Sequence, residues 1–210
     1  MKILVFGATG ATGYHVISQG IEKGHVMTGF VRDPSKLKIK HKNLSLFKGD
    51  VSNAQQVEEA CKDQDAVVSV LGASTPFKRN LTLIKGIENI VNAMMRLSIS
   101  RFIYQSFLGV NEYRADLGFL MDRIVPIILQ NVIKDHEAKE QIITKSNLQW
   151  TIARCSMLTN GAPTGKFIHG ERITAASPLP SISRADVADF MIQQVNERTY
   201  INKKPRIMSR

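Results

Sequence analysis

Two kinds of segment alternate along the chain. Short, β-branched apolar runs are typical of strands buried on both faces of a sheet. They occupy Lys2–Gly7, His25–Val31, Leu44–Phe47, Ala66–Leu71, Phe102–Ser106 and Gln149–Ala153, with a weaker run at Lys204–Met208. Between them, apolar residues recur three and four positions apart, as in helices that pack on a sheet. These helices are predicted at Thr12–Lys23, Asn53–Lys62, Leu81–Leu97, Asp135–Lys145 and Arg184–Glu197.

The pattern fits a single folded unit. No internal repeat, low-complexity tract or Gly/Ser-rich linker divides residues 1–210. We therefore expect one Rossmann-like, doubly wound α/β domain with a mostly parallel central sheet. Ser52 and Ser183 precede two of the predicted helices, where a serine hydroxyl is suited to cap the free amides of the first turn.

Two stretches carry neither pattern clearly. Leu108–Ile133 mixes glycine and asparagine with large apolar residues, which indicates either a buried helix broken at Pro126 or an apolar flap over a site. Ser156–Pro180 is rich in glycine and proline. Because long loops in compact domains are often functional, we expect segments 106–135 and 155–180 to form a second ligand site.

The first strand runs into glycines at three-residue spacing and then into a helix, as Gly7-Ala-Thr-Gly10-Ala-Thr-Gly13. The first glycine permits a tight turn, the second lets a pyrophosphate approach the backbone, and the third lets helix and strand pack closely. The helix N-terminus attracts the anion, Ala11 lies in the same turn, and Thr9 and Thr12 add hydroxyl donors. With a second strand following, the motif predicts dinucleotide binding.

The residue after the second strand distinguishes the two nicotinamide dinucleotides, because an acidic side chain there accepts from a free ribose 2′-hydroxyl. This chain has Arg32, whose guanidinium matches a 2′-phosphate, with Ser35 and Lys36 within a turn of it. We therefore expect NADP (NADPH), with NAD less favoured. Asp33 is the alternative: facing the ribose it would favour NAD, although aspartate before proline is also a common turn residue.

Residues after the third and fourth strands complete the predicted cofactor site. Asp50 can accept from an adenine amino group and Val51 can pack against the ring, although Asp50 equally suits a helix N-cap. Leu71, Gly72 and Ala73 follow the fourth strand. All five lie at carboxyl ends of predicted strands, where open α/β sheets bind their ligands.

Composition narrows the class of protein. Of 210 residues, 43% are hydrophobic and 22% charged, which supports a packed core. No apolar run approaches the roughly 18 residues of a membrane span, and the first residues lack the apolar length of a secretory signal. Two cysteines and scattered histidines show no metal-ligand spacing. We expect a cytoplasmic monomer or homodimer without a metal or a membrane partner.

The net charge of +10 indicates an anionic partner. One basic cluster runs from Arg32 to Lys42, and another, from Lys203 to Arg210, ends the chain, where a solvated tail is the simpler interpretation. The first cluster lacks the interleaved aromatic residues typical of nucleic-acid binding. Cofactor phosphate explains it better, so no nucleic-acid partner is expected.

Several motifs occur in the order of a known family: the glycine motif, Val31-Arg32-Asp33, Gly49-Asp50-Val51, Ser146-Asn-Leu-Gln-Trp-Thr151 and Ile182-Ser-Arg-Ala-Asp186. Over residues 1–197 the chain resembles the atypical short-chain dehydrogenase/reductases of the NAD(P)H-binding, NmrA-like group. Within the group it is most similar to the flavin reductase/biliverdin reductase B type. The resemblance implies an NADPH-dependent oxidoreductase that transfers hydride to a flavin, tetrapyrrole or quinone-like acceptor.

The chain departs from the wider superfamily at the catalytic acid. There, a Tyr-x-x-x-Lys pair ahead of the sixth strand protonates a carbonyl and holds the nicotinamide ribose. Here the register of Ser146–Thr151 puts Val132 at the tyrosine position and His136 at the lysine position, whereas a register on Lys139 puts Asp135 at the tyrosine position. The missing tyrosine favours a conjugated acceptor, which needs alignment more than a dedicated acid.

Two residues are candidates for the chemistry. Ser106 ends the fifth strand and either hydrogen-bonds the acceptor or only satisfies the strand end. His136 either contacts the nicotinamide ribose or relays a proton near neutral pH, or else is a surface histidine at a helix start. Cys155 follows the sixth strand, at the expected nicotinamide contact. Phe119–Met121 suit either a core or a pocket wall.

Two other functions stay open. A regulator of the NmrA-like kind binds NADP as a redox signal without turnover, and a site without the tyrosine suits it equally. A sugar-nucleotide epimerase or dehydratase is disfavoured, because it needs the tyrosine and a larger C-terminal substrate domain.

Overall fold

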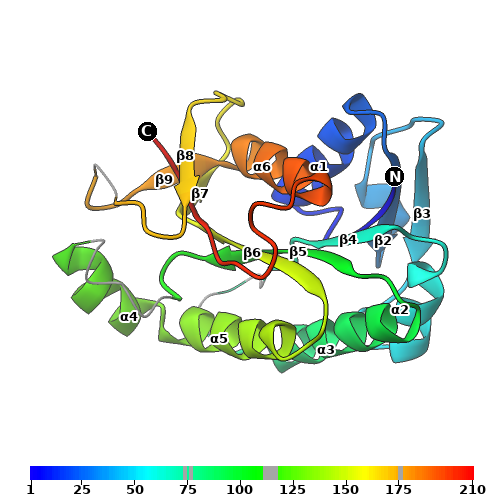
Figure 1. The fold of residues 1–210 in the computed structure, drawn as a ribbon, viewed down its shortest axis with the longest axis horizontal. Coiled ribbons are helices and arrows are strands. Elements are labelled where there is room, and N and C mark those ends of the chain that lie inside the picture. Colours follow the sequence, from blue (N-terminus) through cyan, green and yellow to red (C-terminus); the bar gives the residue numbers. More distant parts are fainter. Residues whose placement is uncertain (73–74, 76–77, 111–117, 175–176) are drawn as a thin grey trace.

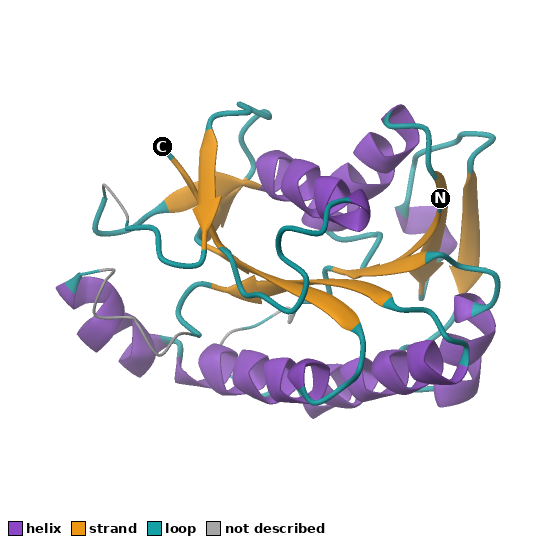
Figure 2. Ribbon diagram, in the orientation of Figure 1, coloured by secondary structure: helices purple, strands orange, loops and turns teal. Residues whose placement is uncertain are grey.

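The chain forms an α/β domain around one central sheet (Figures 1 and 2). The computed structural model describes residues 1–72, 75, 78–110, 118–174 and 177–210. The sheet has eight strands in the order β3-β2-β1-β4-β5-β6-β10-β8. Its strand pairs are parallel except β8 with β10, which is antiparallel. The predicted fold class, a Rossmann-like domain with a mostly parallel sheet, is therefore confirmed.

The predicted elements are present with small shifts at their ends. The strands are β1 (Lys2–Phe6), β2 (Val26–Val31), β3 (Leu44–Lys48), β4 (Ala66–Ser69), β5 (Arg101–Phe107), β6 (Gln149–Cys155) and β10 (Arg206–Ser209). The helices are α1 (Ala11–Glu22), α2 (Ala54–Cys61), α3 (Leu81–Arg96), α5 (Gln130–Thr144) and α6 (Arg184–Asn196). Of these, α5 begins a full turn earlier than its apolar pattern predicts.

Helices cover both faces of the sheet. Helices α1 and α6 lie on one face and α2, α3 and α5 on the other (Figure 1). Successive side chains of a strand point to opposite faces. In β1, Ile3 and Val5 therefore join the core under α1 and α6, while Leu4 and Phe6 join the other core. This double burial is why the strands are apolar at consecutive positions.

The two predicted helix caps have different outcomes. Ser183 caps α6, as predicted, by accepting from the amide of Asp186. The cap of α2 is Asn53 rather than Ser52. The amide and hydroxyl of Ser52 both donate to Asp50 Oδ1, at 2.8 and 2.6 Å, so its side chain is committed to the preceding turn.

The first irregular stretch is largely helical where the structure describes it, with residues 111–117 outside the description. A π-helical turn at Leu120–Ile124 continues into α4 (Val125–Ile128) and then α5. Pro126 lies in the first turn of α4, directly after the π-helical turn, so the winding of the helix changes close to the proline but the helix does not end there. The helix is not buried as one alternative expected, because Phe119 and Ile127 are 75% and 71% exposed.

The second irregular stretch contains strands too short to show a pattern. β7 (Met157–Thr159) pairs with β9 (Ser181–Ser183) in a separate two-stranded sheet, and β8 (Phe167–Gly170) extends the main sheet. The C-terminal segment is not a solvated tail, because it forms β10 and buries Arg206. Of the described helices, none is long and apolar enough to cross a membrane.

Candidate functional site: a two-part cleft at the carboxyl ends of the strands

The turn after β1 has the close backbone contacts that its glycines predict. Gly7 has a φ of +87°, and a side chain there would meet the carbonyl of Val70 on the neighbouring chain segment. A Cβ on Gly13 would lie 2.1 Å from the carbonyl oxygen of Gly7. Helix α1 thus packs directly on the turn, which only glycine allows at this position.

The N-terminus of α1 is open at this turn. Its N-cap, Gly10, supplies no side chain, and the first turn, which holds Ala11 and Thr12, contains no acidic residue. The amides of that turn and the positive end of the helix dipole are therefore available to an anion. Thr12 is buried, whereas Thr9 is exposed and lines the cleft.

The first cavity, of about 400 Å³, extends from this turn toward β2 and β3. The residues predicted for the cofactor that line it are Gly7, Thr9, Gly10, Arg32, Asp50, Val51, Leu71 and Gly72. Ala73 lies outside the described residues. The cavity therefore gathers the carboxyl ends of β1, β2 and β4, where a doubly wound sheet binds its ligand.

Arg32 has a second basic residue beside it that the apolar pattern alone does not single out. Lys48 ends β3, and the parallel register places it beside Val31. Arg32 and Lys48 line one depression with Asp50, whose carboxylate accepts from Ser52. That hydrogen bond, with Arg32 nearby, keeps the pKa of Asp50 below its usual range. The parallel pairing of β2 with β3, which places Lys48 beside Val31, is the feature from which Lys48 can be predicted.

Asp33 takes part in a local turn. Its carboxylate accepts from the amide and the hydroxyl of Ser35, at 3.0 and 2.7 Å, and caps the short 3₁₀ helix Pro34–Lys36. These hydrogen bonds lower the pKa of Asp33. Ser35 and Lys36 are both exposed in this turn, and the hydroxyl of Ser35 already donates to Asp33.

The second cavity, of about 540 Å³, adjoins the first. Val70, Leu71 and Gly72 line both. Its walls come from the ends of β5 and β6, from β7 and from one stripe of α5 that comprises Val132, Asp135, His136 and Lys139. Both alternative registers for the superfamily's tyrosine and lysine fall on this stripe, because positions three and four apart share a helix face.

The predicted catalytic residues are held in a buried network. Ser106 lines the second cavity and donates to Glu140 Oε1 at 2.6 Å, while its Oγ lies 3.4 Å from His136 Nδ1. Tyr104 Oη is 2.8 Å from the same nitrogen. Arg154 forms two hydrogen bonds with Glu140, at 3.2 and 2.7 Å. Ser106 therefore faces the cavity, and its hydroxyl hydrogen is already donated to Glu140.

His136 is not a surface histidine, which was one of the alternatives for this residue. It lies in the second turn of α5 and its ring lines the cavity. Burial, with a smaller effect of Lys139, moves the pKa of His136 well below its ordinary value. The imidazole is therefore neutral at pH 7, which does not fit the predicted proton relay near neutrality.

Lys139 is a buried cation in the cavity wall. The residue is 3% exposed, and burial lowers its pKa to about 8 although Asp135 acts in the opposite direction. Among the described residues, no carboxylate lies within ion-pair distance of its Nζ. Asp135 is instead engaged by Arg79 Nε at 2.9 Å and the amide of Asn80 at 2.6 Å.

The end of β6 brings polar groups to the same cavity. Cys155, predicted at the nicotinamide, lines the cavity as a buried thiol. Ser156 is 2% exposed and also lines it, and its Oγ has no hydrogen-bond partner among the described residues. Gln105 Oε1 is a second unpartnered atom there. Both atoms are therefore free to form a hydrogen bond with a molecule bound in the cavity.

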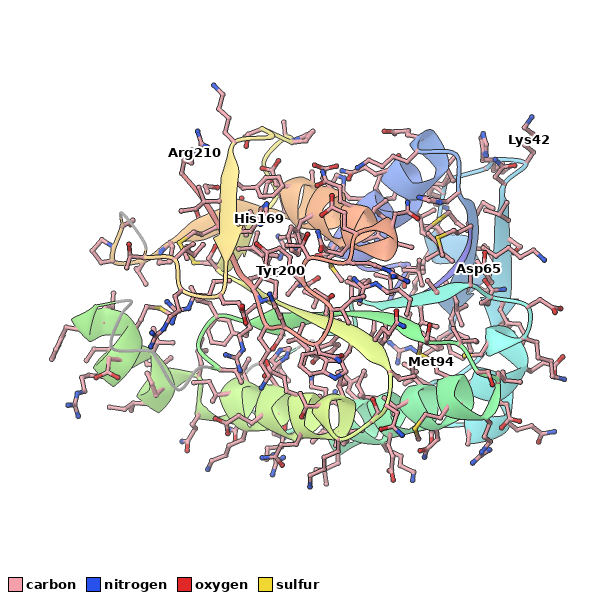
Figure 3. The ribbon with its side chains drawn as sticks, viewed as in Figure 1. Lys42, Asp65, Met94, His169, Tyr200 and Arg210 are labelled. Carbon is pink, nitrogen blue, oxygen red and sulfur yellow. The ribbon has the colours of Figure 1, made fainter. Side chains whose placement is uncertain are left out.

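No described tyrosine is among the residues that line the second cavity. A Tyr-x-x-x-Lys spacing does occur at Tyr200 and Lys204, but it lies in the turns before β10 rather than on α5. Tyr200 Oη bonds His169 Nδ1 at 2.8 Å, and neither of these two residues, which Figure 3 labels, lines the cavity. Tyr113 lies outside the described residues.

The apolar wall also differs from expectation. Met121 is buried in a small separate core with Leu108, and Phe119 is exposed, so neither lines the cavity. Leu129 and Val132 do so instead. The predicted acceptor segments 106–135 and 155–180 each contribute a part, but α5 beyond residue 135 and Arg184 contribute as well.

The residues present fit a nicotinamide dinucleotide. The glycine turn gives backbone access to a pyrophosphate, and a Cβ at Gly7 or Gly13 would destroy the turn's geometry. The unpartnered Ser156 hydroxyl and Gln105 carbonyl give an amide-bearing ring donors and acceptors at the far end of the same cleft.

Comparison with known proteins agrees with this geometry. Residues 7–198 match the family described as NAD(P)H-binding, so the chain belongs to that family. Proteins similar to it include an uncharacterized chloroplastic protein of Arabidopsis thaliana, 27% identical over all of this chain and 77% of the relative. Another is the photosystem II assembly factor Ycf39 of Synechocystis, 24% identical over 93% of this chain and 58% of the relative.

Solved structures share the fold over the whole chain. The oxidoreductase ylbE of Lactococcus lactis superposes with a TM-score of 0.84 at 21% identity, covering 100% of this chain and 91% of that one. ChuY of Escherichia coli O157:H7, an anaerobillin reductase, superposes with a TM-score of 0.82 at 19% identity, covering 100% of this chain and 97% of that one.

Substitution of Gly13 tests the packing of α1 on the turn. We expect Gly13→Ala to destabilise the protein by about 1–3 kcal/mol, because the new methyl group meets backbone that cannot move aside. Gly72→Ala is the matched control, since nothing lies within 4 Å of its Cβ position. Denaturant unfolding measures both, and equal stability of the two variants would contradict the close packing at Gly13.

Substitution of Lys139 tests the cost of its burial. The pKa of Lys139 in the folded protein, about 8, lies below the ordinary value of 10.5. Burial of the charged ammonium therefore lowers the free energy of unfolding by its full amount below pH 8, and this effect disappears above about pH 10.5. We expect Lys139→Met to raise the free energy of unfolding at pH 7 by on the order of 1–3 kcal/mol. The gain should vanish as the pH rises through this window.

Lys134→Met is the control for this measurement. Lys134 is exposed on the same helix, so its substitution should change stability by less than about 0.5 kcal/mol. A Lys139→Met variant that is less stable than the parent at pH 7 would show that the ammonium contributes to folding.

Proposed function

We propose that the chain is an NADPH-dependent reductase that transfers hydride to a flavin, quinone or similar conjugated acceptor. The observation that carries the proposal is the continuity of the cleft. Residues 70–72 line both cavities, so a dinucleotide at the glycine turn can extend from Arg32 to the unpartnered Ser156. The family supports a nicotinamide cofactor, and the likeness to ChuY, a reductase, supports reductase chemistry.

Several features favour NADPH over NADH. Arg32 and Lys48 offer two cations to a 2′-phosphate, and Asp33, the residue that would favour NAD, is turned toward Ser35. A bound 2′-phosphate would gain charge-assisted hydrogen bonds from the guanidinium. Lys42, another basic residue of this cluster, lies at the periphery of the molecule (Figure 3).

The chain's own groups favour a conjugated acceptor. When bound, NADPH supplies the hydride, and the reduced acceptor takes its proton from water. Ser106 can accept a hydrogen bond from the acceptor, because its own hydrogen is held by Glu140. The walls formed by Leu129, Val132 and Leu158 suit a flat apolar ring. No described tyrosine lines this cavity to protonate a ketone.

The assay is anaerobic NADPH oxidation followed by absorbance, first with FMN and then with a naphthoquinone. We expect saturable oxidation with both acceptors. Tight NADP binding without oxidation of NADPH by any acceptor would contradict the reductase and favour a regulator that binds NADP as a redox signal.

Arg32 tests the choice of cofactor separately. We expect Arg32→Ala to weaken NADPH binding by about 10- to 100-fold, because a charge-assisted contact contributes roughly 1.5–3 kcal/mol. NADH binding should change little. Lys42→Ala, in the same basic cluster but outside the cleft, is the control. Unchanged NADPH affinity in Arg32→Ala would place the 2′-phosphate elsewhere.

A further inference from the structure

Positive side chains from three elements meet in the second cavity. Lys139 comes from α5, Arg184 from the start of α6, and Lys78 from the segment between β4 and α3. Helices α5 and α6 cover opposite faces of the sheet (Figure 1). The cations therefore reach the cavity from different sides. They are not simply charged residues on the solvated face of one helix.

The cavity wall holds little negative charge to balance them. Asp135 is the one carboxylate among its described lining residues. That carboxylate already forms an ion pair with Arg79 and accepts from a backbone amide. His136 is neutral, and Glu140, in the layer behind, is bonded to Arg154.

Among the described residues, none of the three cations forms an ion pair with an acidic side chain. Arg184 Nη1 donates to two neutral oxygens, Asn160 Oδ1 at 2.6 Å and the carbonyl of Leu158 at 3.4 Å, which orient the guanidinium without neutralising it. Lys139 is buried with no ion pair. A buried charge is normally paired, because its desolvation is otherwise costly.

We infer that the second cavity takes an acceptor bearing a phosphate, carboxylate or sulfonate, held by Lys139 and Arg184 while its conjugated ring lies against the apolar wall. The inference rests on the proposed reductase function and adds the chemical class of its substrate. The cofactor's own phosphates do not account for these cations, since the glycine turn and Arg32 line the other cavity.

Two acceptor pairs that differ by the anionic group test the inference. FMN and riboflavin share the isoalloxazine ring and differ in a phosphate, whereas 1,4-naphthoquinone-2-sulfonate and 1,4-naphthoquinone differ in a sulfonate. In wild-type protein at low ionic strength we expect kcat/KM for FMN to exceed that for riboflavin by tenfold or more. The preference should shrink at high salt, because salt screens charge.

Substitution of Lys139 and of Arg184 tests whether these two cations cause the preference for anionic acceptors. In Lys139→Met and in Arg184→Met we expect the ratio of kcat/KM between the anionic and the neutral member of each pair to fall by tenfold or more. Using the ratio cancels differences in reduction potential between acceptors. Lys134→Met, which alters an exposed lysine of α5, should leave the ratio unchanged.

Failure of this inference is distinguishable from failure of the proposed function. Equal kcat/KM for FMN and riboflavin, or a ratio unaffected by both variants, would overturn the anion site and leave the reductase intact. If no acceptor is reduced, flavin binding with saturating NADP⁺ still decides, by fluorescence titration. Tighter FMN binding that is lost in Lys139→Met would support the site, and equal binding of FMN and riboflavin would overturn it.

Discussion

The close packing of α1 on the turn after β1 is the constraint on which the site depends. Gly13 has no room for a side chain against the carbonyl of Gly7, and Gly7 has none against Val70. This contact fixes the start of the helix at the end of the first strand. Because β1 lies between β2 and β4, the helix amides open at the point where the strand order changes direction. The cleft, and therefore both cavities, begins there.

The sequence predicts the lining of the first cavity well and that of the second cavity poorly, for a physical reason. The first cavity uses one contiguous motif and residues that directly follow apolar strands, such as Asp50 and Leu71. The second cavity combines Lys78, Lys139 and Arg184, which are far apart in the chain and meet only through tertiary structure. On α5, Asp135 and Lys139 look like a solvated face, because charged residues at helical spacing normally are one.

Part of the basic composition serves the core rather than a partner. Arg101, Arg154 and Arg206 are each 5% exposed or less. Arg101 donates to backbone carbonyls of Gln149 and Gln194, and burial lowers its pKa to about 10. Arg206 donates to the carbonyl of Ile173, which ties β10 to the preceding loop. The net charge alone therefore overstates the surface available to anions, and the expectation of a solvated C-terminal tail is wrong for this reason.

The buried charges at and behind the second cavity fall into two groups. Glu140 and Arg154 neutralise each other and hold Ser106, so their cost of burial is offset within the fold. Lys139, the residue directly before Glu140 on α5, has no such partner, and burial lowers its pKa to about 8. A fold gains nothing from an unpaired buried ammonium that methionine could replace. The ammonium therefore makes physical sense when a ligand supplies the counter-charge.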